Sequence, residues 1–149
     1  MRISDAKQAI DELVSVFFSV FAVKKGCKTD LSIINQLFIA EALIIKNVTT
    51  APEIYSLQSF IEPREKMLNE GTLVDFKEEE LWERTEIFGN IAQRLSVYRK
   101  SGMMSGKAFE ARGMKTIQFI NTPDGWKMSS LAWDDEREGL SIPDEYLNY

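Results

Sequence analysis

The Gly89-Asn90 dipeptide constrains the fold of this chain more than any other feature of its sequence. A glycine-asparagine pair between two strand-like segments, here Leu81–Phe88 and Ile91–Tyr98, is typical of a β-hairpin with a two-residue loop. Such a loop fixes the strand register, so Glu86 is expected opposite Gln93. The side chains that then share one face of the hairpin are Trp82, Arg84, Glu86, Phe88, Ile91, Gln93, Leu95 and Val97.

This shared face is mostly apolar but carries three polar side chains, Arg84, Glu86 and Gln93. A few polar groups that converge within an apolar wall are typical of a small-molecule pocket. We therefore take Trp82, Arg84 and Gln93 as candidate ligand-binding residues. Glu86 is the candidate general base of a catalytic site. The alternative is an Arg84–Glu86 ion pair on a surface that faces solvent or a partner subunit.

A second hairpin is indicated by the turn Thr122-Pro123-Asp124-Gly125, which separates Lys107–Asn121 from Trp126–Asp135. A four-residue loop would pair Asn121 with Trp126 and place on one face Thr116, Gln118, Leu131 and Trp133, with Arg112 and Met114 further along. The ligand-binding candidates from this hairpin are Arg112, Gln118 and Trp133. For the tryptophan, a place in the hydrophobic core is the simpler explanation. Residues 101–106 would connect the two hairpins as a flexible segment.

The first half of the chain is predicted to be mainly helical. Residues 4–25 carry apolar side chains at helical spacing, and Gly26 can end that helix. A short helix capped by Thr29 or Asp30 and a strand over Phe38–Val48 are expected next. A longer helix should then begin with a capping box at Thr50–Glu53. Pro63 would kink or end this helix, and Gly71 would close it.

Helices that precede a run of antiparallel strands make an α+β layer fold. We expect a curved antiparallel sheet that wraps around the N-terminal helices and leaves a cone-shaped cavity between them. The chain has 149 residues, the usual size of one domain, and it shows no repeat or linker. Residues 1–149 are therefore predicted to form a single domain.

The sequence contains no histidine, which excludes histidine-dependent nucleophilic catalysis and histidine metal ligands. Its single cysteine, Cys27, cannot form an intramolecular disulfide and suits a reducing compartment. The acidic run Asp75–Glu80 lacks the glycine and the spaced carboxylates of a calcium loop. We interpret it as a solvated acidic strand edge. No cofactor and no metal site is predicted.

Charge and hydropathy argue against nucleic acid and membrane as partners. The net charge is −5 and there is no basic run, so the chain does not suit a phosphate backbone. The longest apolar stretch, Leu13–Val23, is too short to span a bilayer. Acidic residues precede it, which is the wrong sign for a signal peptide. A cytoplasmic location is expected.

Three segments in order resemble the nuclear transport factor 2-like superfamily, which has the cystatin-like fold. Leu37–Ile44 is similar to the first strand of that family, Thr85–Ala92 to its central hairpin and Gly125–Glu136 to its closing strand. The hairpin, Arg112-Gly113 with Ile117-Gln118, and the ending Ile142–Leu147 together resemble an uncharacterised branch of small proteins. The resemblance covers nearly the whole chain.

The resemblance implies a homodimer packed through the sheets and a pocket between sheet and helices, but it does not imply one reaction. Members include ketosteroid isomerases, dehydratases, polyketide cyclases and non-catalytic adaptors. The isomerases need a tyrosine in the first helix and a carboxylate base four residues after the alanine of the first strand. Here the first tyrosine is Tyr55, and the base position falls on Lys46. Steroid-type isomerisation is therefore not expected.

Tyr55 and Arg64 are the remaining ligand-binding candidates, expected on or after the long helix near the mouth of the cone. Arg64 could hold a carboxylate ligand through two hydrogen bonds. It could equally pair with Glu62, Glu65 or Glu86.

Three functions stay open from the sequence. The first is a small-molecule-binding homodimer with an apolar pocket that takes an apolar or carboxylate-bearing ligand. The second is a lyase or isomerase of the polyketide cyclase/dehydratase type with Glu86 as general base. The third is a non-catalytic dimeric adaptor whose cavity is filled by its own side chains.

Overall fold

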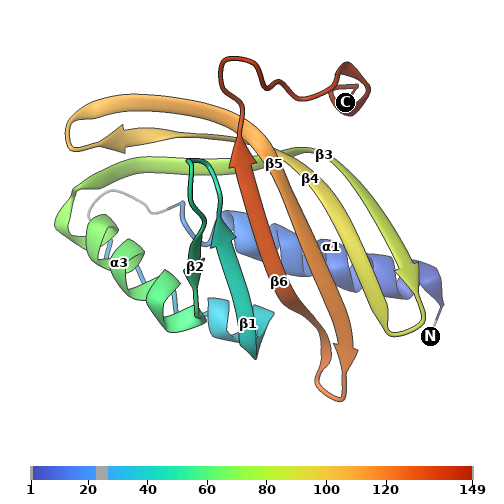
Figure 1. The fold of residues 1–149 in the computed structure, drawn as a ribbon. Helices are drawn as coiled ribbons and strands as arrows, with labels where there is room; N and C mark the ends of the chain where they lie inside the picture. Colours follow the sequence, from blue (N-terminus) through green and yellow to red (C-terminus); the bar gives the residue numbers. More distant parts are fainter. Residues whose placement is uncertain (1, 23–26, 149) are drawn as a thin grey trace.

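The computed structural model describes residues 2–22 and 27–148 and confirms the predicted α+β class. Six strands form one curved, open sheet in the order β2-β1-β6-β5-β4-β3. Figure 1 shows helix α1 (Ile3–Ser19) crossing behind the long strands and helix α3 (Leu57–Glu70) beside β2, while the C-terminal segment leaves the sheet where β6 ends. We call the face that packs against the helices the inner face and the opposite one the outer face.

The other elements, in chain order, are α2 (Ile34–Leu37), β1 (Phe38–Lys46), β2 (Glu53–Tyr55), β3 (Leu73–Phe88), β4 (Ile91–Met104), β5 (Lys107–Thr122), β6 (Gly125–Asp135) and the 3-10 turn η1 (Asp144–Tyr146). Neighbouring strands are antiparallel except β1 and β6, which run parallel. The expectation of a wholly antiparallel sheet is wrong for that pair. No hairpin joins these two strands, so no turn dictates their relative direction.

Helix α1 lies on the inner face because its apolar side chains recur at helical spacing. Its buried residues are Ala6, Ile10, Val14, Phe17 and Phe18. The helix predicted over residues 4–25 ends earlier, at Ser19, and its predicted end at Gly26 lies outside the described residues. Within the described part of the chain, every helix falls short of the length and hydropathy needed to cross a membrane.

The register predicted from the Gly89-Asn90 turn is confirmed, since Glu86 pairs with Gln93. The second hairpin also has its predicted pairing, Asn121 with Trp126. Local turn chemistry thus sets the alignment of both hairpins.

The connection between the two hairpins is shorter than predicted. Residues 101–104 were expected to be flexible but continue β4, and their partners lie in β5. Only Ser105 and Gly106 turn the chain, with φ angles of 50° and 80°. Two consecutive residues with positive φ match the twist of paired strands, so β4 and β5 also form a tight hairpin.

A β-bulge in the β5–β6 pairing changes which side chains share a face. The pairing shifts by one residue between Gln118 and Phe119, so Lys115, rather than Met114, lies opposite Trp133. The predicted common face of Gln118 and Trp133 is therefore wrong. The tryptophan belongs to the buried core on the inner face, and the glutamine is exposed on the outer face.

The predicted start of the long helix is wrong, because a short strand precedes the helix. Thr50 to Glu53 do not cap a helix, because Glu53–Tyr55 pairs with β1 as the edge strand β2. The capping box is formed instead by Ser56 and Ser59, and α3 then continues through Pro63. The carbonyl that lacks a donor at this proline belongs to the exposed Ser59, where water can reach it. The helix ends at Gly71 with φ of 79°, as predicted.

A glycine in β5 makes room for a buried tyrosine. Tyr98 of β4 is fully buried, and its hydroxyl donates to the backbone carbonyl of Asp134 and to the carboxylate of Asp135. Gly113 lies opposite Tyr98, and a Cβ atom there would overlap both the phenol oxygen and the Asp134 carbonyl. The buried position of Tyr98 therefore requires a residue without a side chain at position 113.

We predict that Gly113→Ala lowers the free energy of unfolding by about 3 kcal/mol, because the added methyl group cannot be accommodated without moving backbone. The matched control is Gly102→Ala in β4, whose Cβ would meet its nearest atoms at 3.2 Å. That variant should change stability by no more than about 1 kcal/mol. Urea unfolding of both variants measures the difference, and equal effects would contradict the close packing described for Tyr98.

Candidate functional site

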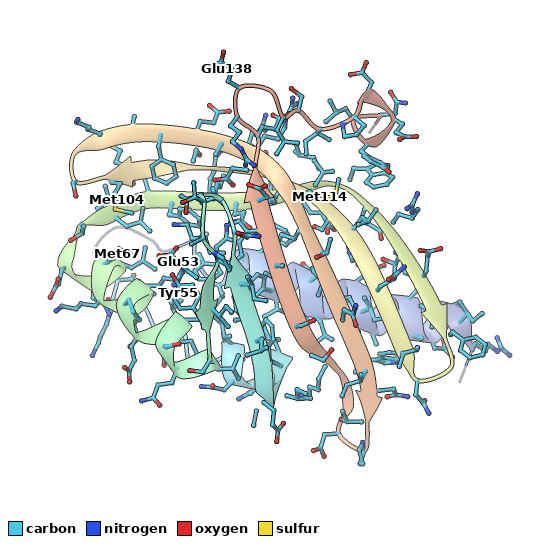
Figure 2. The ribbon with its side chains drawn as sticks, in the orientation of Figure 1. Glu53, Tyr55, Met67, Met104, Met114 and Glu138 are labelled. Atoms are coloured by element: carbon cyan, nitrogen blue, oxygen red, sulfur yellow. The ribbon has the colours of Figure 1, made fainter. Side chains whose placement is uncertain are left out.

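A cavity of about 660 Å³ lies between the inner face of the sheet and the helices α1 and α3. Much of its wall is aromatic, formed by Phe17, Phe21, Phe60, Phe76, Phe109 and Trp133. Met67 of α3 and Met104 at the end of β4, both labelled in Figure 2, also line it. Apolar walls of this extent are typical of sites for small organic molecules.

Charged side chains interrupt this apolar wall: Lys46, Arg64, Glu78, Lys100, Lys115 and Asp135, with Lys107 and Glu110 also in the lining. Two of the cations have carboxylate partners within the wall. Lys115 lies 2.7 Å from Glu78, and Lys100 lies 3.1 Å from Asp135. Lys46 lies 3.9 Å from Glu53 of the edge strand. Three ammonium groups are thus matched with carboxylates.

Arg64 differs from these lysines because no carboxylate of the described residues lies within ion-pair distance of it. Its guanidinium stands 3.9 Å from the centre of the Phe60 ring and 4.9 Å from that of Tyr55. One nitrogen donates to the Phe60 carbonyl at 3.2 Å. Burial lowers the pKa of Arg64, although a hydrogen bond with Tyr55 and the charge of Glu53 oppose the shift, and the group stays cationic at neutral pH. It is a positive charge in the cavity wall that can take an anionic ligand group.

The Lys115–Glu78 pair is the most buried charge pair of the cavity, with side chains 5% and 9% exposed. The ammonium nitrogen lies 4.2 Å from the centre of the Tyr98 ring and 5.2 Å from that of Trp133. Burial lowers the pKa of Lys115, although the charge of Glu78 opposes the shift. The pair therefore places a basic amine and a carboxylate side by side in a water-poor wall.

A second buried cation, Arg94, joins α1 to the sheet beside the cavity. Its side chain is 3% exposed and lies 2.6 Å from Asp11 of α1 and 3.6 Å from Glu83 of β3, and it also pairs with Glu80. A register shift in β3 between Glu80 and Trp82 lets Glu80 and Glu83 both reach inward. This network connects helix and sheet, and none of these side chains lines the 660 Å³ cavity.

The predicted site built on Glu86 lies on the wrong face for this cavity. Arg84, Glu86 and Gln93 are exposed on the outer face, where Gln93 Nε2 donates to Glu86 Oε1 at 3.0 Å. Their neighbours in sequence, Thr85 and Arg94, point toward α1 instead. A hairpin register fixes which side chains share a face but not which face meets the helices, and the prediction failed at that step.

Two further candidates also lie on the outer face, where the C-terminal segment covers part of the sheet. The Trp82 ring stands 4.7 Å from that of Tyr146 in η1, measured between ring centres. Arg112 pairs with Glu136 at 2.8 Å, and Glu136 accepts a hydrogen bond from the backbone of Ile142. These residues hold the tail against the sheet. The third such candidate, Gln118, is exposed nearby and pairs across the strands with the exposed Gln93.

Three predicted candidates do lie together at the cavity. Arg64 and Trp133 both line it, and Tyr55 contacts the guanidinium of Arg64. The sequence reasoning missed Lys115 and Glu78. For Glu78 the missed signal was strand parity: the acidic run was interpreted as a solvated edge, but alternate residues of an edge strand still point inward.

No family model matches the chain, and no curated protein matches it. Several solved structures, in contrast, match nearly the whole chain. A nuclear transport factor 2-like superfamily protein from Salmonella enterica serovar Typhimurium superposes with a TM-score of 0.75 at 16% identity, over 95% of this chain and 99% of that one. A protein of unknown function from Shewanella baltica, also described as NTF2-like, gives 0.65 at 16% identity, over 92% and 98%. An uncharacterised protein from Caulobacter vibrioides with a cystatin-like fold gives 0.70 at 12%, over 91% and 92%.

These comparisons define the class of the molecule as an α+β protein of the cystatin-like fold. Within that class, the chain has the nuclear transport factor 2-like fold, as the sequence resemblance implied. At such low identities the likeness concerns the fold alone. A shared fold does not assign a function, which depends on the side chains of the site.

We predict that Arg94→Met destabilises the protein by about 3 kcal/mol at pH 7, because it leaves three partly buried carboxylates close together without their shared cation. Arg99→Met is the matched control. Arg99 pairs with Glu79 where both side chains are about half exposed, so its loss should cost less than about 1 kcal/mol. Chemical unfolding measures both.

The stability of the wild type and that of Arg94→Met should respond differently to acid. Burial alone would raise the pKa of Asp11, but hydrogen bonds from Lys7 and Arg94 lower it, and the pKa of Glu83 is lowered by Thr85, Lys7 and Arg94 in the same way. Depressed carboxyl pKa values stabilise the fold at neutral pH, and this stabilisation is lost as these carboxylates protonate below about pH 4. The stability difference between wild type and Arg94→Met should therefore shrink in that range. A constant difference from pH 7 to pH 3 would contradict the described network.

Proposed function

We propose that this protein binds a small aromatic or otherwise apolar molecule that carries a carboxylate, in the cavity between the sheet and the helices. The observation that carries the proposal is Arg64, a guanidinium in an aromatic cavity wall with no carboxylate of the described residues within ion-pair distance. An arginine binds a carboxylate through two parallel hydrogen bonds. The apolar part of the ligand would contact the aromatic walls.

The stacking of Arg64 supports this role. The Phe60 ring on one side and the Tyr55 ring nearby hold the guanidinium in place before a ligand arrives. A side chain that is already fixed loses little entropy on binding. The low dielectric of the surrounding walls also strengthens its attraction for an anion.

The other two functions raised by the sequence have less support. Glu86 lies exposed on the outer face, so a lyase or isomerase reaction in the cavity could not use it as a base. The cavity volume of about 660 Å³ argues against an adaptor whose interior is filled by its own side chains. Phe17, Phe21 and Lys46 line the cavity, and none of them can replace the tyrosine and carboxylate of a steroid isomerase.

We also propose that the protein forms a homodimer through the outer face of the sheet. The support is an apolar group at the β3–β4 turn, where Phe88 is 84% and Ile91 57% exposed. Ile120 lies opposite Ile91 on β5, which extends the group across three strands. Large apolar side chains gathered at one place on a surface are typical of an interface.

We predict that Arg64→Met weakens binding of 2-naphthoate about tenfold or more, because it removes charge-assisted hydrogen bonds. The uncharged analogue 2-naphthamide should bind both proteins equally, since it gains nothing from the positive charge. Lys66→Met, an exposed position on the same helix, is the control and should leave both affinities unchanged. Calorimetric titration measures all six combinations. Unchanged naphthoate affinity in Arg64→Met would overturn the role of Arg64.

For the dimer, we predict that Phe88→Asp shifts the protein from dimer to monomer, because a carboxylate would be buried unpaired in the interface. Leu140→Asp in the tail is the control, since Leu140 is 42% exposed and lies outside the apolar group. Size-exclusion chromatography with light scattering gives the masses. A monomeric wild type, or a Phe88→Asp dimer, would contradict the proposal.

A further inference from the structure

The Lys115–Glu78 pair forms part of the cavity wall. The lysine extends from β5 and the glutamate from β3, so they meet over the intervening strand β4. Three aromatic rings surround the amine: Tyr98, Trp133 and Phe18, whose centre lies 5.5 Å away. A buried amine at the surface of a cavity is accessible to a bound ligand but poorly accessible to water.

We propose that Lys115 forms a Schiff base with an aldehyde or ketone bound in the cavity, with Glu78 as its proton-transfer partner. This proposal rests on the proposed function, because the carbonyl compound must enter the same cavity. It adds a covalent step and a second chemical class of ligand group, the carbonyl, to the carboxylate that Arg64 would bind.

The environment of Lys115 favours the neutral amine that this chemistry needs. Burial lowers the pKa of its ammonium and the positive Lys100 in the same wall lowers it further, whereas the hydrogen bond and charge of Glu78 and the charge of Asp135 oppose the shift. Burial beside another cation is a known way to activate a lysine toward carbonyl compounds. When an apolar ligand expels water from the cavity, proton transfer from Lys115 to Glu78 also removes two charges from a poorly solvated place.

The step balances with the groups present. The Lys115 ammonium gives one proton to the Glu78 carboxylate, and the neutral nitrogen adds to the carbonyl carbon. A second nitrogen proton moves to the former carbonyl oxygen, which gives a carbinolamine. Glu78 then returns its proton to that hydroxyl group, water leaves, and the nitrogen lone pair forms the carbon–nitrogen double bond. The products are a protonated imine beside the Glu78 carboxylate and one water molecule, with no oxidant or reductant consumed.

The aromatic lining of the cavity favours a carbonyl group on an aromatic or other apolar body. Trp133 lies between the two ends of the proposed site. The centre of its ring is 6.3 Å from that of Phe60, against which Arg64 packs, and 5.2 Å from the Lys115 nitrogen. Apolar surroundings also favour the loss of water from the carbinolamine.

Reductive trapping tests the proposal directly. The folded protein is incubated with benzaldehyde and sodium cyanoborohydride, and peptide mapping by mass spectrometry locates the benzylated lysine. We expect Lys115 to react about tenfold faster than the exposed Lys66, because a larger fraction of its amine is neutral. Benzaldehyde has no carboxylate, so this result does not depend on Arg64. Labelling spread evenly over the lysines, or confined to exposed ones, would overturn the proposal.

Variants identify the roles of the two residues. Lys115→Arg should lose the cavity adduct and keep surface labelling, whereas Lys66→Arg should keep the cavity adduct. Glu78→Gln should slow trapping at Lys115, and trapping at an unchanged rate would remove Glu78 from the mechanism. The wild-type labelling pattern decides the main point even if Lys115→Arg folds poorly.

The failure of this proposal and the failure of the proposed function give different results. Naphthoate binding without labelling of Lys115 would leave the carboxylate site intact and reject the Schiff base. Labelling of Lys115 without naphthoate binding would reject the carboxylate ligand and keep the reactive lysine.

Discussion

The pairing of β3 carboxylates with buried cations of β4 and β5 is the interaction on which the rest of the structure depends. Glu80 and Glu83 meet Arg94, and Glu78 meets Lys115. A buried charge without its partner is strongly destabilising, so these pairs hold β3 in one register although it is an edge strand. Because Arg94 also binds Asp11 of α1, the same pairs fix the first helix across the sheet. The cavity is the space that remains beside this helix.

Local sequence signals predicted the alignment of the strands. Which face of the aligned strands lies against the helices was decided by long-range contacts. The Gly89-Asn90 turn was sufficient for the register of the first hairpin. It could not show that Glu86 faces outward, since that depends on where α1 packs. The bulge near Gln118 reversed the predicted surroundings of Trp133 for a similar reason. Arg64 could be predicted at the cavity because its position on a helix next to the sheet follows from element order. Lys115 could not, since its partner Glu78 comes from a strand two positions away in the sheet.

The two faces of the sheet have separate tasks. The inner face combines aromatic rings with two ion pairs, Lys115–Glu78 and Lys100–Asp135, which gives a cavity with defined chemical groups. The outer face carries the apolar group at Phe88 at one end and the C-terminal segment at the other, where Trp82 stacks with Tyr146. A substitution on the outer face therefore need not disturb the cavity, because the side chains that line the cavity lie on the opposite face of the sheet.

The strand order has a consequence for the synthesis of this protein. Among the strands of the described residues, β6 is the last in the chain, and it lies between β1 and β5, where it joins the β1–β2 pair to the β3–β5 hairpins. Until β6 has been made, these two parts of the chain are not joined, and β1 and β5 each have an unpaired backbone edge. Such edges are prone to join other chains. A truncation before residue 125 would therefore leave two half-sheets rather than a smaller version of the fold.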